Sequence, residues 1–112
     1  MSSMRTRAAG AVEHVLLMEV ESEQYDQILR DTSADVQRLG SKIDGLLGAD
    51  LYATDDRTHV LVLSHWVDDT AWSKAQWNDD VQNAVVARFT SAQVVHSRLY
   101  RRIALEDGSE PS

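Results

Sequence analysis

The sequence predicts an α+β domain in the order β-α-β-β-α-β, with a four-stranded antiparallel sheet and helices on one of its faces. Four segments are rich in β-branched and large apolar residues, one long segment has helical periodicity, and a second helical segment is broken near Asn78. At 112 residues the chain suits one domain with its own core. We expect residues 11–105 to form it, with disordered ends at 1–10 and 106–112.

The first strand and the first helix follow from the pattern of apolar residues. Val12–Val20 is nearly continuous in apolar residues at its centre, which indicates a strand buried on both faces. Ser22 is expected to cap the helix that follows. Apolar side chains then recur every three or four residues as far as Ile43, and the helix is expected to end near Gly40.

The middle of the chain predicts a hairpin of two strands, Leu46–Thr54 and Thr58–Trp66, joined by an acidic turn. One face of this hairpin is expected to carry Leu47, Ala49, Leu51, Val60, Val62, Ser64 and Trp66. The other is expected to carry Leu46, Tyr52, His59, Leu61, Leu63 and His65. Both faces are therefore largely apolar.

The last third of the chain predicts two short helices and a closing strand. Asp68 and Asp69 can cap the first helix, and Asn78 can cap the second. Ser91–Leu105 is rich in Val, Leu, Ile and Tyr and closes the sheet. The complete order is the ferredoxin-like arrangement, whose helices cover only one sheet face. Because the other face is also apolar, we expect a homodimer in which two sheets pack together as a dimeric α+β barrel.

Composition excludes several classes of function. A net charge of −7 disfavours nucleic acid as a partner. The sequence has no cysteine, which excludes disulfides, thiolate zinc sites and cysteine nucleophiles. The longest apolar run is too short to span a bilayer, so we expect no membrane association and a cytoplasmic protein.

Four segments together resemble the antibiotic biosynthesis monooxygenase superfamily of dimeric α+β barrels. They are Gly45-Leu-Leu-Gly-Ala-Asp-Leu-Tyr, the Asp-Asp-Arg-Thr turn, Val60-Leu-Val-Leu-Ser-His-Trp66 and Asp69-Thr-Ala-Trp72. The resemblance covers about residues 12–104 in element order. It implies a site in each subunit, between the sheet and its helices. In the quinone-forming branch, a phenol anion reduces oxygen without metal or flavin, while the protein supplies an apolar cavity, proton transfer and charge stabilisation.

The resemblance assigns candidate site residues by position. Trp66 matches the strand tryptophan of the quinone-forming branch, and Arg88 is a candidate for its helix arginine. Val62 departs from the pattern, because that branch has an asparagine four residues before the tryptophan. The remaining candidates for substrate binding are Leu47, Leu51, Ser64 and Trp72. The alternatives are that Trp66 and Trp72 are core aromatics and that Arg88 lies on the solvated side of its helix.

The histidines are the candidates for proton transfer, since their ordinary pKa lies near neutrality. His65 and His96 are the first choices for catalysis. A metal cluster of His14, His65 and His96 is conceivable, but it lacks any short-range ligand spacing. Structural or interface histidines are the favoured interpretation, and no metal site is predicted.

Two functions of different classes follow. One is a cofactor-independent, monooxygenase-like enzyme that acts with O2 on an aromatic or polyketide-type small molecule, with Trp66 positioning it. The other is a non-catalytic dimeric barrel that binds a small apolar ligand or a partner, which Val62 favours. A haem or cyclase-type member of the same fold is a third alternative. Haem degradation is disfavoured because the asparagine, tryptophan and histidine of that branch have no clear counterparts.

Overall fold

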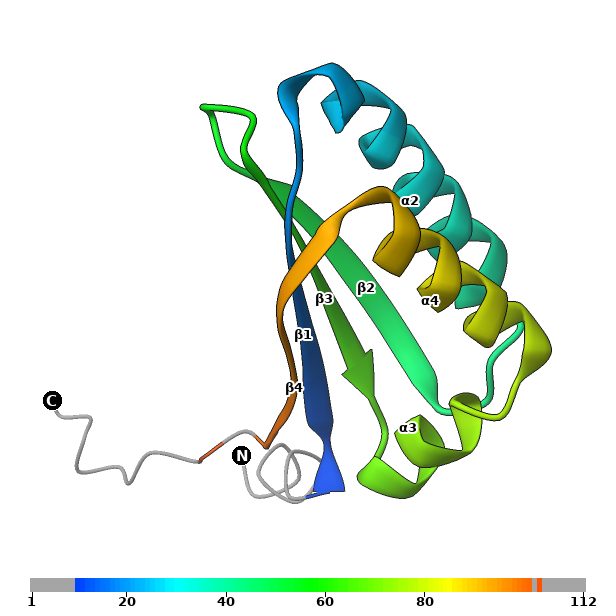
Figure 1. Cartoon of the computed structure of the whole chain (residues 1–112). Coiled ribbons are helices and arrows are strands. Elements are labelled where there is room, and N and C mark those ends of the chain that lie inside the picture. Colours follow the sequence, from blue (N-terminus) through cyan, green and yellow to red (C-terminus); the bar gives the residue numbers. More distant parts are fainter. Residues whose placement is uncertain (1–9, 102, 104–112) are drawn as a thin grey trace, which may run out of the picture.

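The computed structural model describes residues 10–101 and 103, and its elements follow the predicted order (Figure 1). The strands are β1 (Val12–Glu19), β2 (Leu46–Ala53), β3 (His59–Trp66) and β4 (Gln93–Arg101). The helical elements are the 3-10 turn η1 (Ser22–Gln24) and the helices α2 (Tyr25–Gly40), α3 (Asp69–Ala75) and α4 (Asp79–Ser91). Apart from Gly10, the ends that we expect to be disordered lie outside the described residues.

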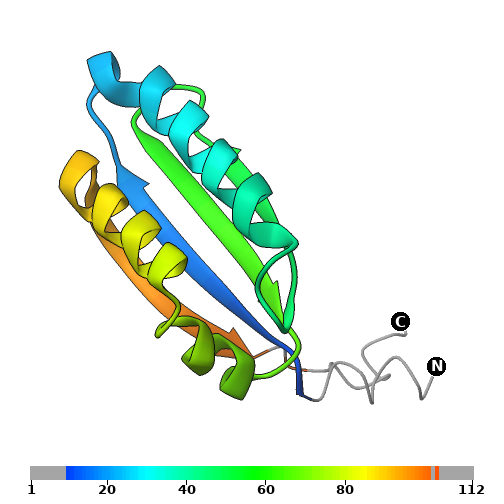
Figure 2. The ribbon, with the colours of Figure 1, turned by 90° about the vertical axis from the view of Figure 1, so that its right-hand side faces the viewer.

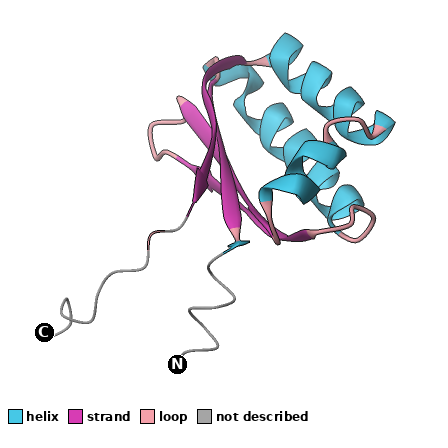
Figure 3. Ribbon diagram, turned by 90° about the horizontal axis from the view of Figure 1, so that it is seen from below, coloured by secondary structure: helices cyan, strands magenta, loops and turns pink. Residues whose placement is uncertain are grey.

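The four strands form one sheet in the order β2-β3-β1-β4, and each neighbouring pair is antiparallel. Helices α2 and α4 lie side by side over one face of this sheet, with α3 beyond the end of α4 (Figure 2). Seen from below, all the helices lie on the same side of the strands (Figure 3). The predicted ferredoxin-like α+β fold is confirmed.

The caps of the two later helices are confirmed, whereas the predicted cap of the first is wrong. An Asp68 side-chain oxygen accepts a 2.8 Å hydrogen bond from the backbone N–H of Ala71. Asn78 caps α4 in the same way. Ser22, by contrast, begins a 3-10 turn, and α2 starts at Tyr25 without a side-chain cap. The turn is closed by a backbone hydrogen bond from Gln24 to Glu21, so the helix begins from backbone pairing alone.

Two buried clusters lie toward opposite ends of the sheet, on its helix side. One contains Met18, Val20, Tyr25, Ile28 and Val60, and the other contains Val12, Trp66 and Ala75. Because β1 passes from Val12 in one cluster to Met18 in the other, the side chains of His14 and Leu16 fall between the clusters on the same face. The middle of this face is therefore available for a cavity.

The predicted facing of the hairpin is wrong at the start of β2. Leu46 pairs with Trp66, but Gly48 pairs with His65, so β2 accommodates one extra residue between these pairs. Such a β-bulge shifts the alternation of side chains by one position. Leu46 consequently faces the helices, and Leu47 is 64% exposed. From Ala49 onward the predicted facing is confirmed.

The outer face of the sheet, opposite the helices, is not covered by any described element (Figure 3). Its apolar residues Val15, Leu17, Leu61 and Leu63 are half-buried by their neighbours within the sheet. None of the helices described is long and apolar enough to cross a membrane.

Candidate functional site

A cavity of about 380 Å³ lies between the helix side of the sheet and the helices. β1 and β3 contribute its floor, and α2 and α4 contribute its walls. Its apolar lining comprises Leu16, Val36, Leu39, Ile43, Leu46, Ala49, Val62, Val81, Ala84, Val85 and Phe89. Phe89 lines the cavity although it is 57% exposed, so the cavity is open to solvent beside α4. This size and polarity suit a small, largely apolar ligand.

Trp66 is a buried part of the cavity lining, as predicted from its position on β3. Its indole Nε1–H donates a 2.9 Å hydrogen bond to Oγ of Ser64, on the same face of the strand. The indole donor is therefore already used, and Trp66 presents mainly its ring surface to a ligand. The Ser64 hydroxyl accepts from Trp66, which leaves its own proton available to another acceptor.

The aromatic helix after β3 contributes one tryptophan to the cavity and directs the other to solvent. Trp72 on α3 lines the cavity, and its ring centroid lies 5.4 Å from that of His14, with 30° between the ring planes. Trp77 is 81% exposed.

His14 is a cavity residue that is not among the predicted site residues. It lies on the helix side of β1, where its Nε2 is 2.9 Å from Oγ of Ser97 on β4. Burial lowers the pKa of His14 below its ordinary value, and the nearby charge of His96 lowers this pKa further. The signal that points to His14 in the sequence is its alternation with buried Val12, which becomes informative once the face of β1 is known.

Arg88 lies inside the cavity and not on the solvated side of α4. It is 7% exposed, and its Nη1 donates hydrogen bonds to Asp35 Oδ2 at 2.9 Å and to Thr32 Oγ1 at 3.3 Å. Its Nε is buried and has no hydrogen-bond partner among the described residues. A guanidinium that lines a cavity can donate a hydrogen bond to an anionic or carbonyl oxygen of a ligand.

His65 and His96, the first choices for proton transfer, do not line this cavity. His65 lies on the outer face, where Nδ1 is 3.1 Å from Glu13 and Nε2 is 3.0 Å from Asp50. His96 is paired with Tyr100 on β4. Their role in catalysis stays a prediction, but it does not involve this cavity, because the alternation of β3 and β4 directs them away from the helices.

The conceivable histidine metal cluster is wrong for the same reason, since His14 faces the helices and His65 faces the opposite way. Across residues 10–101 and 103, no group of three or more His, Cys, Asp or Glu side chains is arranged to hold a metal ion.

The candidate substrate-binding residues divide into two groups. Val62, Ser64 and Trp72 line the cavity, as predicted. Leu47 does not, because the bulge turns it outward, and Leu46 takes its place. Leu51 faces the helices but packs against the cluster around Met18 and is outside the cavity lining.

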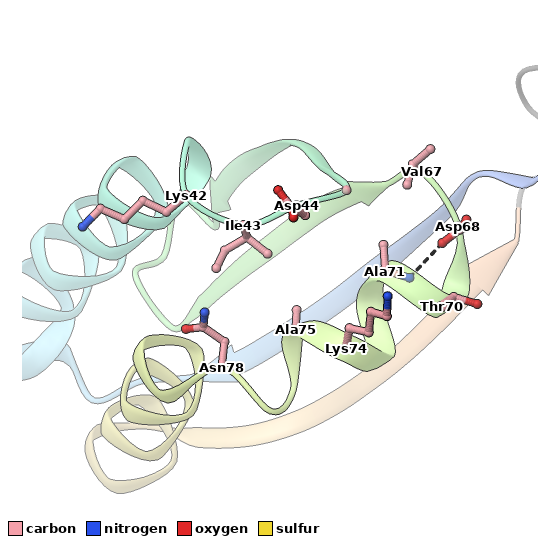
Figure 4. A pocket seen from close by; sticks show the side chains of 11 residues that line it. Lys42, Ile43, Asp44, Val67, Asp68, Thr70, Ala71, Lys74, Ala75 and Asn78 are labelled. Carbon is pink, nitrogen blue, oxygen red and sulfur yellow. Dashed lines mark hydrogen bonds between the residues drawn. The ribbon is translucent and has the colours of Figure 1, made fainter.

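A second hollow, of about 460 Å³, lies where the loop after α2 meets α3 (Figure 4). Lys42, Asp44 and Lys74 contribute to its lining, and the Lys42 side chain points away from it. The Asp68 carboxylate in this wall already caps α3. These groups are solvated or used in structure, so this hollow is a weaker candidate than the cavity beneath α2 and α4.

Comparisons with known proteins agree with this architecture. The family model described as antibiotic biosynthesis monooxygenase matches residues 11–87. A conserved protein from Methanosarcina mazei Go1 has 13% sequence identity and a TM-score of 0.77, over 88% of this chain and 99% of that one. A solved structure of an antibiotic biosynthesis monooxygenase has 14% sequence identity and a TM-score of 0.68, over 85% of this chain and 99% of that one. A protein from Mycobacterium tuberculosis has 13% sequence identity and a TM-score of 0.68, over 91% of this chain and 99% of that one.

At such low identity, these structural likenesses establish the fold alone. A search of curated proteins finds no match to the sequence.

Proposed function

The chain is a member of the antibiotic biosynthesis monooxygenase family, and on that premise we propose that it oxidises a flat aromatic or polyketide-like small molecule with dioxygen. The observation that carries this proposal is the cavity bounded by Trp66 and Trp72, with apolar walls from α2 and α4. Aromatic faces and aliphatic walls bind a flat ring system through apolar contact and offset stacking. The bound molecule would lie over the floor formed by β1 and β3.

Two polar groups in the cavity support an anionic intermediate. The guanidinium of buried Arg88, which lines the cavity, can stabilise negative charge on a ligand oxygen. The Ser64 hydroxyl is oriented by Trp66 and can donate from the floor. We propose that Ser64 takes over the donor role that Val62 cannot provide, because both residues face the same cavity.

The proposed reaction converts a ring methylene, or the equivalent aromatic C–H of a phenol, into a carbonyl. The substrate loses two hydrogens and gains one oxygen atom from dioxygen, and the second oxygen atom leaves with those two hydrogens as water. All four electrons come from the substrate, so the protein's own groups have to bind it, stabilise its anion and move protons.

The proposal is tested by oxygen uptake with an anthrone-type phenol as substrate. Trp66→Phe removes both part of the aromatic floor and the donor that orients Ser64, so kcat/KM should fall by about tenfold or more. Trp77→Phe is the matched control, because Trp77 lies in solvent, and its kcat/KM should equal that of the wild type. Equal turnover in Trp66→Phe would remove Trp66 from the mechanism.

A second candidate is a non-catalytic protein that binds a small apolar ligand in the same cavity. The observation that favours it is Val62, an aliphatic side chain at a position that faces the ligand. Tight binding of the aromatic probe, measured by calorimetry, together with no oxygen uptake would select this function over the oxidation. Oxygen uptake that is saturable in the same probe would exclude it.

A further inference from the structure

We propose that His14 is the base that takes the proton from the hydroxyl or enol group of the bound molecule, with Ser97 as its positioning residue. This inference rests on the proposed function, because it assigns the proton acceptor of the same cavity. Three observations support it: β1 places the imidazole in the cavity lining, only one of its ring nitrogens is hydrogen-bonded among the described residues, and the other candidate bases are engaged elsewhere.

The imidazole of His14 is held in one orientation by two different elements. Its Nε2 is 2.9 Å from Oγ of Ser97 on β4, and its ring packs 5.4 Å from the ring of Trp72 on α3. The other nitrogen, Nδ1, has no hydrogen-bond partner in the part of the chain that the structure describes. When Nε2–H donates to Ser97, the lone pair of Nδ1 is free to accept a proton.

The surroundings keep His14 neutral before the ligand binds. Burial lowers its pKa, and the charge of His96, on the outer face of β4, lowers it further. Of the residues packed against it, Trp72 and Ser97 carry no charge, and neither does Ser64, its partner across β3. A neutral imidazole at neutral pH is the form that a general base requires.

The other ionisable groups near the cavity are already engaged. The Asp35 carboxylate accepts hydrogen bonds from Arg88 at 2.9 Å and from Arg38 at 2.8 Å. His65 and His96 lie on the outer face. Among the described residues that line the cavity, His14 is thus the base with a free nitrogen.

The step is a simple proton transfer. The O–H bond of the ligand breaks, an N–H bond forms at Nδ1 of His14, and the electron pair remains on the ligand oxygen. The products are an imidazolium and a ligand anion. The Trp72 ring face stabilises the first, and the Arg88 guanidinium, which lines the same cavity, stabilises the second.

The experiment uses para-nitrophenol, whose phenolate absorbs at longer wavelength than its phenol, bound to the full-length protein under nitrogen. At about pH 6, where the free probe is mainly neutral, binding to the wild type should produce the phenolate band. In parallel, ¹⁵N NMR should record one histidine becoming an imidazolium. In His14→Gln the probe should bind within about threefold of the wild-type Kd, with the phenolate fraction about tenfold lower. His59→Gln, a histidine of the outer face, is the matched control and should behave as the wild type.

Ser97 is tested by its effect on protonation. Ser97→Ala should move the pH at which the bound probe ionises upward, and Ser97→Thr, which keeps the hydroxyl, should restore the wild-type value. A purely structural role would change the Kd in both variants without moving this pH.

Each outcome decides the inference. An equal phenolate band in His14→Gln, a neutral probe in the wild type, or no binding of the probe to the wild type would overturn it. Because the experiment excludes oxygen, its result is separate from that of the proposed function. Ionisation by His14 with no later oxygen uptake would leave the base assigned and reject the oxidation.

Discussion

The indole nitrogen of Trp66 donates a 2.9 Å hydrogen bond to the hydroxyl of Ser64, two residues earlier on the same strand. This pair makes the floor of the cavity a coupled unit, because the serine accepts from the tryptophan while its own proton remains free. A substitution of either residue is therefore expected to change how much the other contributes to the free energy of unfolding.

The first prediction concerns this coupling. Ser64→Ala leaves the buried indole N–H without its partner, which should lower the free energy of unfolding by about 1–3 kcal/mol. Trp66→Phe removes that donor, so adding Ser64→Ala to Trp66→Phe should cost clearly less than Ser64→Ala alone. Urea denaturation of the two single variants and the double variant measures the coupling energy. Strictly additive losses in the free energy of unfolding would contradict the predicted coupling between Ser64 and Trp66.

The second prediction concerns Arg88, with Arg38 as its matched control, since both pair with Asp35. Arg88→Met removes a buried cation from the cavity lining, so the Kd of an aromatic anion should rise by about tenfold or more. Arg38 is 42% exposed at its side chain, and Arg38→Met should leave that Kd unchanged. Calorimetric titration compares the two variants. Equal losses of affinity would point to Asp35 and not to the cavity cation.

The strands, the helices and the fold class could be predicted because they depend on periodicity within one segment. The facing of β2 at Leu47 could not, because the bulge between Leu46 and Gly48 adds a residue with no sequence signal of its own. The same limit applies to His14. Its role depends on Ser97 and Trp72, which reach it from distant segments only after the strands pair.

Arg88 and His65 show which properties of site residues depend on contacts between distant segments and which follow from one segment alone. A lone arginine on an amphipathic helix has no pattern that distinguishes an inward from an outward position, and only Asp35 and Thr32 on α2 explain why it is buried. His65 does follow a pattern, since strand alternation places its side chain on the other face of the sheet from that of Ser64. Its face could therefore be predicted, but its choice for catalysis rests on residue type and not on a place in the cavity.

The third prediction concerns the pH dependence of stability. Burial lowers the pKa of His14 below its ordinary value of 6.5, so below that pH the unfolded state binds more protons than the folded state. The free energy of unfolding should therefore decrease as pH falls from 6.5 toward the lower folded-state pKa. His14→Gln should flatten this slope, and His59→Gln should retain it. Urea midpoints across this range measure the effect, and an unchanged slope in His14→Gln would contradict it.

The fourth prediction concerns Gly45, which lets the loop after α2 approach α3. Its φ is 85°, and a Cβ at this position would lie 2.3 Å from the Cβ of Ala71. Gly45→Ala combines backbone strain with a clash and should lower the free energy of unfolding by about 2 kcal/mol or more. Gly40→Ala is the control, because its Cβ meets nothing within 4 Å, and stability should be unchanged or slightly higher. Thermal and urea unfolding compare the two variants, and similar losses of stability in both would contradict the role of Gly45.

The fifth prediction concerns the outer face of the sheet, through which we propose that two copies associate. Leu61 and Leu63 on β3 continue the apolar surface of Val15 and Leu17 on β1, and no described element covers it. Sedimentation equilibrium at micromolar concentration should give twice the mass of one chain.

Leu63→Glu places a charge at the centre of that face and should raise the dimer dissociation constant by about 100-fold or more. Val86→Glu, at a 61% exposed position on α4, is the control and should remain dimeric. A wild-type monomer would reject the interface. Dimers of equal stability in Leu63→Glu would show that the copies associate through another surface.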